Sequence, residues 1–140
     1  MKKPIVTDLN ILKQKSEAVR PDEIASILQD LEDSLDINKG IGLSAIQIGI
    51  AKNISIIRIG TTKINLVNAY IKEKDNKFRM VGEGCLSLPS LHIDTIRYEK
   101  ILYVNNGVEN IASGILSIAI QHEIRHTQGK TILDDKWRNK

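Results

Sequence analysis

At 140 residues, with 41% hydrophobic and 26% charged residues, the chain has the composition of one folded globular domain, and we predict a single domain over residues 1–140. The net charge of +3 comes with no run of Lys and Arg interleaved with aromatic residues, which argues against direct nucleic-acid binding. No stretch approaches the ~20 consecutive apolar residues that cross a bilayer, so we expect no membrane association.

The start of the chain and its cysteine content indicate the compartment. The first ten residues, MKKPIVTDLN, contain lysines with no apolar run after them, so they do not resemble a secretory signal. The single cysteine, Cys85, excludes an internal disulfide and fits a reducing compartment. We therefore expect a cytoplasmic protein.

The first clear element is a predicted helix over residues 21–40. Its apolar residues repeat at helical spacing and form one face, which consists of Ile24, Ile27, Leu28, Leu31 and Leu35. Pro21 is typical of a first helical turn, and Gly40 lies just beyond the expected end. We predict a supporting helix that covers the rest of the fold and carries no chemistry.

The next segment, GIGLSAIQIG at residues 40–49, contains glycines that allow close backbone approach or a positive φ at Gly40 and Gly42. The side-chain amide of Gln47 could donate a hydrogen bond to a developing oxyanion. The glycine pattern alone is weak, because it matches neither a dinucleotide fingerprint nor a phosphate loop. Most such stretches are turns that lead into a strand.

Short β-rich runs follow at residues 53–60, 62–70 and 100–107, with Gly and Asn between them. Most of the connections are too short for helices, which favours antiparallel pairing. Cys85 lies within this part of the chain in VGEGCLSLP, where two glycines and a proline constrain the backbone. A cysteine there is either a buried, inert side chain or a thiolate that binds a metal ion.

The last long element is a predicted helix over residues 110–129, with Asn110 as its N-cap and Gly129 as its C-terminal cap. Helical steps continue its apolar stripe to His122 and His126. The stripe consists of Ile111, Ile115, Ile118 and Ala119. The predicted class is therefore α+β: small antiparallel β-sheets around a buried helix that carries H-E-x-x-H, with an N-terminal covering helix.

Two histidines at i and i+4 can share one metal ion, and Glu123 beside the first could reach a water on that ion. The alternative is a pair of core histidines satisfied by hydrogen bonds, with Glu123 in a surface ion pair. A catalytic site needs a third ligand, and the extended pattern H-E-x-x-H-x-x-G-x-x-H places Ile132 at that position. Cys85 is the strongest remaining candidate.

Three segments together resemble the signature of the peptide deformylase family. GIGLSAIQ, EGCLS and QHEIRH are similar, in order and spacing, to the family's G-x-G-L-A-A-x-Q, E-G-C-L-S and Q-H-E-x-D-H. The opening NILKQKSEAV and the tail GKTILDD are similar too, so the resemblance covers nearly the whole chain. The chain looks like a compact form without the long C-terminal extension of many members, and we expect it to lack any ribosome docking by such a helix.

The resemblance implies a metal-dependent hydrolase, a peptide deformylase, that removes the N-formyl group from the N-terminal formylmethionine of nascent polypeptides and releases formate. It implies that Cys85, His122 and His126 bind one divalent metal ion, physiologically Fe²⁺, and that Zn²⁺, Ni²⁺ or Co²⁺ can occupy the same site. Expected partners are the formyl-Met nascent peptide and the ribosome near its exit tunnel. The protein is expected to be a monomer in the cytoplasm of a bacterium or, if phage-encoded, of the host.

The resemblance also assigns the catalytic and substrate-binding residues. A metal-bound water would attack the formyl carbon with Glu123 as general base and acid, while the Gln47 amide and the Leu86 backbone N–H stabilise the oxyanion. Gly42 and Glu83 would make backbone contacts to the peptide. The pocket for the methionine side chain would be lined by Ile41, Val81, Ile115, Ile118 and Ala119.

The departures from the family's pattern are Ser44, Gly82, Arg125 and Thr127. Arg125 stands where the family has an aspartate, and the arginine that pairs with this aspartate matches Arg97. We predict that Arg125 turns outward or pairs with Glu99, Asp94 or another acid, and that the ligand geometry survives. His92 either borders the peptide cleft or is a plain surface residue.

Two other hypotheses remain open at this point. A degenerate member could bind metal or peptide without turnover, but the intact Glu123 and Gln47 argue against it because a structural site needs neither. A different metallohydrolase could act on another N-acyl or peptide bond, and only the expected shape of the pocket argues against that.

Overall fold

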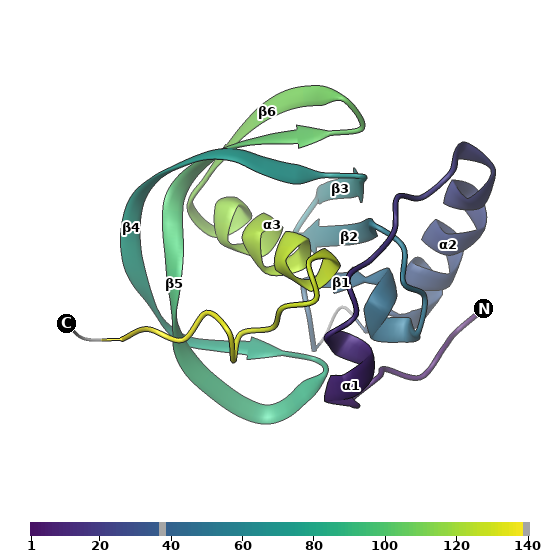
Figure 1. The fold of residues 1–140 in the computed structure, drawn as a ribbon, viewed down its shortest axis with the longest axis horizontal. Helices are drawn as coiled ribbons and strands as arrows, with labels where there is room; N and C mark the ends of the chain where they lie inside the picture. The colour runs from purple at the N-terminus through teal and green to yellow at the C-terminus, as the bar shows by residue number, and fades with distance from the viewer. Residues whose placement is uncertain (37–38, 139–140) are drawn as a thin grey trace.

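The computed structural model describes residues 1–36 and 39–138 and has one helix at the centre of the fold (Figure 1). This helix, α3 (Gly114–Thr127), lies between two antiparallel sheets, β1–β2–β3 and β4–β5–β6, while α2 (Pro21–Ser34) covers the far side of the first sheet. The arrangement confirms the predicted α+β class. None of the helices in the described residues has both the length and the apolar composition needed to cross a membrane.

Within each sheet, every strand pairs antiparallel with the next strand in the chain, whereas β3 and β4 belong to different sheets. The strands are β1 (Gly42–Ser44), β2 (Ile54–Ile59), β3 (Thr62–Val67), β4 (Tyr70–Cys85), β5 (Leu88–Asn105) and β6 (Val108–Ser113). Between β5 and β6, Asn106 and Gly107 have φ of 50° and 81°. Positive φ at both positions gives the type I′ turn, whose twist matches that of paired strands. The long strands β4 and β5 curve around α3 (Figure 1).

The side chains of β2 alternate between two hydrophobic clusters, one against α2 and the other against α3. Ile56 is fully buried in the cluster that includes Leu31 of α2. Its neighbour Ile57 is fully buried on the other face, in the cluster that includes Ile120 and Ile124 of α3. Successive side chains of a strand point to opposite faces, so one strand serves both clusters. Burial of each of these side chains is worth about 1.5–3 kcal/mol, which fixes α3 against the first sheet.

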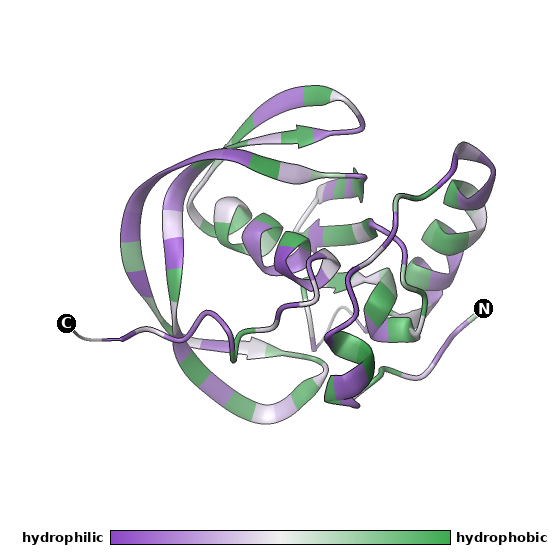
Figure 2. Ribbon diagram, viewed as in Figure 1, coloured by the Kyte–Doolittle hydropathy of each residue, from purple (hydrophilic) through white to green (hydrophobic). Residues whose placement is uncertain are grey.

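The predicted N-terminal covering helix is confirmed as α2. It begins at Pro21, and the Glu23 carboxylate accepts a hydrogen bond from the Arg20 backbone N–H at 3.0 Å. Hydrophobic and hydrophilic bands alternate along it, as an amphipathic helix requires (Figure 2). The helix ends at Ser34, earlier than predicted, and residues 37–38 of the predicted range lie outside the described residues.

The prediction that the last helix begins at residue 110 is wrong. Asn110, the predicted N-cap, lies within β6, and the Ile111 side chain is 64% exposed on that strand. Gly114, with φ of 63°, turns the chain from the strand into α3. The other end agrees with the prediction, because Gly129 has φ of 77° just after the helix, as a C-terminal cap requires.

Two short helical segments and the tail complete the scaffold. The 3-10 helix η1 (Ala45–Ile48) follows β1, and α1 (Leu9–Leu12) packs against it. After α3 the tail runs back to β5, where the backbone N–H of Ile96 donates to Asp135 O at 2.8 Å (Figure 1). The backbone N–H of Trp137 likewise donates to the carbonyl oxygen of residue 94 at 2.8 Å. The tail is thereby fixed beside the middle of β5.

Candidate active site

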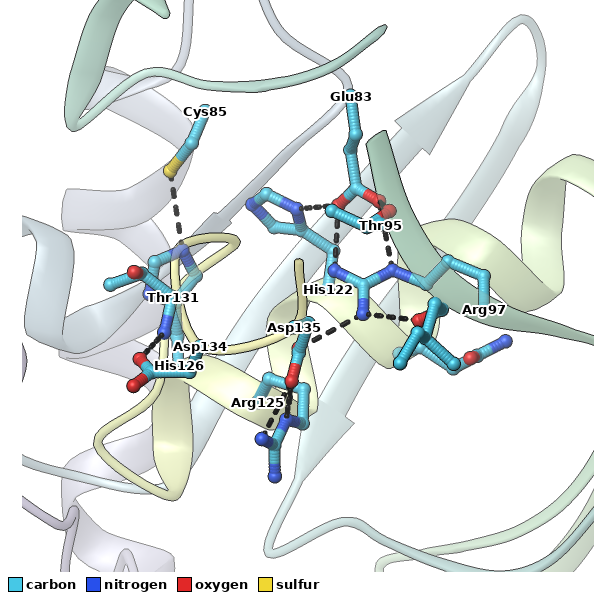
Figure 3. Close-up of polar contacts among 12 residues, drawn as sticks. Glu83, Cys85, Thr95, Arg97, His122, Arg125, His126, Thr131, Asp134 and Asp135 are labelled. Atoms are coloured by element: carbon cyan, nitrogen blue, oxygen red, sulfur yellow. Dashed lines mark hydrogen bonds and ion pairs between the residues drawn. The ribbon is translucent and has the colours of Figure 1, made fainter. Parts of the chain in front are cut away.

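Three side chains with metal-binding donors meet between β4 and α3. Cys85 ends β4, and His122 and His126 lie one turn apart on α3 with ring centroids 5.0 Å apart. The donor atoms of all three residues lie within 4.8 Å of one another. Cys85 Sγ is 3.4 Å from His126 Nε2 (Figure 3). The structure therefore brings together the three residues that were predicted as ligands.

Irregularities in β4 aim the cysteine at the helix. The pairing of β4 with β5 shifts register twice between Met80 and Cys85, and Gly82 within this stretch has φ of 69°. Bulges of this kind bend a strand and re-aim its side chains. Cys85 then pairs with Leu88 across a two-residue turn, which fixes the thiol at the end of the hairpin.

The Glu83 carboxylate forms a hydrogen bond with one ring nitrogen of His122. His122 Nδ1 lies 2.6 Å from Glu83 Oε2. Because a carboxylate only accepts, Nδ1 carries a proton, so Nε2 is the nitrogen that can offer a lone pair to a cation once its own proton is lost. Glu83 also accepts from Arg97 Nε and Nη2, each at 2.8 Å, and from Thr95 Oγ1 at 2.6 Å (Figure 3). Sequence reasoning assigned Glu83 only a backbone contact and missed this network.

Burial and charge shift the pKa values of this cluster. Burial alone would raise the pKa of Glu83, but hydrogen bonds from His122 and Arg97 outweigh it and lower that pKa to about 2. Burial opposes the charged form of His122 as well, yet hydrogen bonding to Cys85 and the nearby carboxylates raise its pKa well above the ordinary value. Burial and repulsion from His122 lower the pKa of His126 well below the ordinary value.

These donors fit one first-row transition metal ion. A thiolate and two imidazoles are ligand types that bind such ions at about 2.0–2.3 Å. His126 is 1% exposed, and its Nδ1 has no hydrogen-bond partner among the described residues, so only its Nε2 takes part in the cluster. The negative surroundings that attract a proton to His122 would also attract a divalent cation.

Glu123 follows His122 in α3 and is 3% exposed. Ser44 Oγ lies 3.0 Å from Glu123 Oε1 and 2.7 Å from Ser55 Oγ, so the hydroxyl that stands in place of the family's alanine has partners. The carboxylate fits because Gly42 has no side chain: a Cβ there would lie 2.6 Å from Glu123 Oε2. Burial raises the pKa of Glu123, which moves it towards that of a general base at neutral pH.

The two residues predicted as oxyanion donors flank the cysteine. Gln47 is 1% exposed, and its Oε1 accepts from the Ser44 backbone N–H at 2.9 Å. Since that N–H can only donate, the amide nitrogen points the other way, 3.6 Å from Cys85 Sγ and 3.2 Å from Ser87 Oγ. Leu86 is the first residue of the turn after Cys85, so its backbone lies at the same end of the hairpin.

A cavity of about 760 Å³ adjoins this cluster. Most of the residues that were predicted to bind substrate line this cavity: Ile41, Gly42, Glu83, Ile115, Ile118 and Ala119. Val81 does not line it: its side chain is 70% exposed, and Met80 and Gly82 line the cavity instead. Val81 follows Met80 in the strand, and neighbouring side chains of a strand point to opposite faces. His92 also borders the cavity.

Arg125 pairs with an acid, as predicted, but the acid is Asp135. Arg125 Nε and Nη2 lie 3.0 and 2.7 Å from the Asp135 carboxylate oxygens. Arg97 Nη1 donates to the same carboxylate at 2.9 Å (Figure 3). Asp135 was missed as a site residue, and its only sequence signal was its place after the motif helix, next to Asp134.

Comparisons with known proteins identify the family of this chain. The sequence profile of the family described as Polypeptide deformylase matches residues 2–140. A peptide deformylase from Natranaerobius thermophilus is 34% identical over 142 aligned positions, which cover 96% of this chain and 91% of that protein. The structure of a peptide deformylase from Synechococcus elongatus in complex with actinonin is similar with a TM-score of 0.85 at 27% identity, covering 99% of this chain and 80% of the other. That of Thermotoga maritima has a TM-score of 0.89 at 24% identity over 99% of both chains, a likeness in fold. By its sequence and its architecture, the chain belongs to the polypeptide deformylase family of enzymes.

Proposed function

We propose that this protein removes the N-formyl group from the N-terminal formylmethionine of nascent polypeptides and releases formate. One observation carries the proposal: the buried Glu123 carboxylate adjoins three clustered metal-binding donors beside a partly apolar cavity. Membership of the family supports the same reaction.

The proposed ligands of the cation are Cys85, His122 and His126. When bound, a divalent cation would polarise the formyl oxygen and acidify a water molecule. We propose Fe²⁺ as the physiological ion, with Zn²⁺, Ni²⁺ or Co²⁺ able to occupy the site, because thiolate and imidazole donors accept all of these ions. The hydrogen bond from His122 Nδ1 to Glu83 would leave Nε2 as the nitrogen that holds the cation.

Glu123 is the proposed general base and then the general acid. It takes a proton from the attacking water as the water oxygen bonds to the formyl carbon. The C–N bond then breaks, and Glu123 passes the proton to the departing nitrogen, which becomes the free amino group of methionine. Formate leaves with the water oxygen. The contact with Ser44 supports this role because it holds the carboxylate in one orientation.

The negative charge that develops on the formyl oxygen needs donors that are already oriented. Gln47 Nε2 and the Leu86 backbone N–H are the proposed donors. The bond from the Ser44 N–H to Gln47 Oε1 supports this role because it fixes which end of the amide faces the site. Oriented donors in a buried site need no reorganisation during the reaction.

The proposed methionine pocket has walls from Ile41, Ile115, Ile118 and Ala119, while Gly42 and Glu83 contact the peptide through their backbones. Aliphatic walls suit an unbranched thioether side chain. The Ile41 and Ile115 side chains are 46% and 67% exposed, so they offer apolar surface that a ligand can bury. We further propose that the single domain acts as a monomer on chains emerging from the ribosome, in the cytoplasm of a bacterium or of a phage-infected host.

The test is formate release from a short formyl-Met peptide by the Ni²⁺-loaded protein. Glu123→Gln removes the base while keeping the shape of the side chain, and we expect kcat to fall by about 10²–10⁴-fold with metal content unchanged. Glu109→Gln is the matched control, because Glu109 pairs with Lys72 at the surface. The corresponding acetyl-Met peptide should be cleaved far more slowly. Wild type and Glu123→Gln that are equally inert at full metal content would refute the proposed activity.

A further inference from the structure

Two arginines from different elements share one carboxylate behind the candidate metal centre. Asp135 accepts from Arg97 at 2.9 Å and from two nitrogens of Arg125 at 3.0 and 2.7 Å. The side chains of Arg97 and Asp135 are 3% and 11% exposed, and that of Arg125 is 32% exposed. Two of the three side chains in the bridge, drawn in Figure 3, are therefore mostly shielded from water.

The bridge continues to a ligand. Arg97 uses Nη1 for Asp135 and turns Nε and Nη2 to the two oxygens of Glu83. Glu83 Oε2 in turn accepts from His122 Nδ1 at 2.6 Å. The guanidinium is planar, so fixing one edge of Arg97 fixes the other, and with it the carboxylate that orients His122.

Charge explains why this chain needs an acid at position 135. A buried guanidinium is costly unless it is paired. Position 125 on α3 carries Arg125 in place of the aspartate of the family's pattern, so the helix adds a positive charge where the family supplies a negative one. Asp135 pairs with both guanidinium groups, and its own backbone oxygen accepts a hydrogen bond from the Ile96 N–H at 2.8 Å. The carboxylate thus reaches the bridge from a fixed backbone.

We propose that Asp135 is a positioning residue for the metal ligand His122, acting through Arg97 and Glu83 in place of the aspartate that is absent at position 125. This inference depends on the proposed function, since it takes His122 to be a ligand. The tail after α3 then supports the metal site through Asp135, although none of its described residues lines the cavity.

The first test compares Asp135→Asn with Asp134→Asn in the Co²⁺-loaded protein. Both changes remove one tail carboxylate, but Asp134 accepts only from the Thr131 backbone N–H among its described bonds. We expect Asp135→Asn to release Co²⁺ to a chelator about 10–100-fold faster than wild type and to shift the Co²⁺ absorption bands. Asp134→Asn should match wild type in both measurements. Equal release rates for wild type and Asp135→Asn would overturn the inference.

The second test is a rescue that a purely structural role does not predict. Arg125→Asp combined with Asp135→Asn returns a carboxylate to the helix and removes the one in the tail. We expect this double variant to release Co²⁺ within about threefold of the wild-type rate, well short of the 10–100-fold loss typical of such partners. If Asp135→Asn is impaired and the double variant is not restored, the inference is wrong. If Asp135→Asn fails to fold, the double variant decides alone. Normal folding and Co²⁺ retention in the double variant would support the inference, and failure of either would overturn it.

A third measurement separates this inference from the proposed function. In the cation-free protein, the ¹⁵N and ¹H resonances of His122 Nδ1–H should change in Asp135→Asn and stay unchanged in Asp134→Asn. Absence of thiolate-to-Co²⁺ charge-transfer bands in wild type would defeat the proposed metal site, and the resonances would still decide whether Asp135 acts on His122. Unchanged resonances in Asp135→Asn would overturn the inference whatever the wild type binds.

Discussion

Gly42 and Glu123 occupy adjoining space, which makes Gly42→Ala a sensitive probe of the proposed general base. The new Cβ would lie 2.6 Å from Glu123 Oε2 and 3.1 Å from the Ile56 carbonyl oxygen, so the carboxylate must move. Misplacement of a catalytic group by about 1 Å costs on the order of 10²-fold in rate. We expect steady-state kinetics to show a fall in kcat of about that size, with KM changed little.

Gly40→Ala is the matched control for that variant. Its Cβ would lie 2.9 Å from Leu86 Cδ1, the end of a flexible side chain that can turn aside. We expect kcat within about threefold of wild type, because the proposed base keeps its place. A Gly40→Ala variant as impaired as Gly42→Ala would show that the glycine segment tolerates no side chain at either position and would remove the argument about Glu123.

Gln47→Leu tests the proposed oxyanion donor. Leucine keeps the volume of the side chain but offers no N–H, and loss of one such donor costs about 10²–10³-fold in kcat. The control is Ser87→Ala, which removes the neighbouring hydroxyl 3.2 Å from Gln47 Nε2 and leaves the amide in place. Loss of transition-state stabilisation should lower kcat and leave KM little changed. A Gln47→Leu variant affected only in KM would contradict the assigned role.

One face of helix α3 packs in the core and another lines the cavity. A pair of isoleucine variants should separate the contribution to stability from the contribution to substrate binding. Ile120 is fully buried in the core, whereas Ile115 lines the cavity and is 67% exposed. Ile120→Ala should lose about 2–5 kcal/mol of unfolding free energy in denaturant titrations. Ile115→Ala should change stability by less than about 0.5 kcal/mol and lower kcat/KM for a formyl-Met peptide about tenfold. The opposite pattern would mean that the cavity is not the methionine pocket.

The second sheet shows where local sequence patterns mislead. Ile111 falls at helical spacing with Ile115, which extended the predicted helix backwards into what is β6. The signal that should have prevailed is Asn106–Gly107, a dipeptide typical of a two-residue hairpin turn, followed later by Gly114. The strand β4 was missed for a different reason: it is mostly polar and exposed, so it shows little of the alternation that marks a half-buried strand.

Removal of the metal ion should lower the stability of the whole domain, because the proposed ligands join the end of β4 to α3. An ion at about 1,000 times its Kd stabilises the folded state by about 4 kcal/mol, which in a domain of this size raises Tm by about 10 °C. We expect thermal unfolding of wild type to show this difference between the Ni²⁺-loaded and chelator-treated forms. Cys85→Ala should reduce the difference to a small fraction. Equal Tm values for the two wild-type forms would contradict the proposed site.

The three proposed ligand residues could be predicted from the sequence, whereas the side chains that orient them could not, for a physical reason. His122 and His126 share one helical face, so their proximity follows from local geometry. Cys85 was the strongest remaining candidate for a third ligand because the extended motif places Ile132 at that position, and the resemblance to the family supported the choice. The contacts of Glu83 with Arg97, and of Arg97 with Asp135, depend on how β4, β5 and the tail meet in space, and no periodicity in the sequence encodes that meeting.

The shared carboxylate also constrains the evolutionary history of the chain. Acquisition of Arg125 before Asp135 would have left two guanidinium groups near one another with no carboxylate between them. In the reverse order, the new Asp135 carboxylate could pair with Arg97 before Arg125 arose, so we expect that order of substitutions. Among relatives, an arginine at position 125 should co-occur with an acidic residue at position 135, whereas lineages that retain aspartate at 125 should be free to vary there.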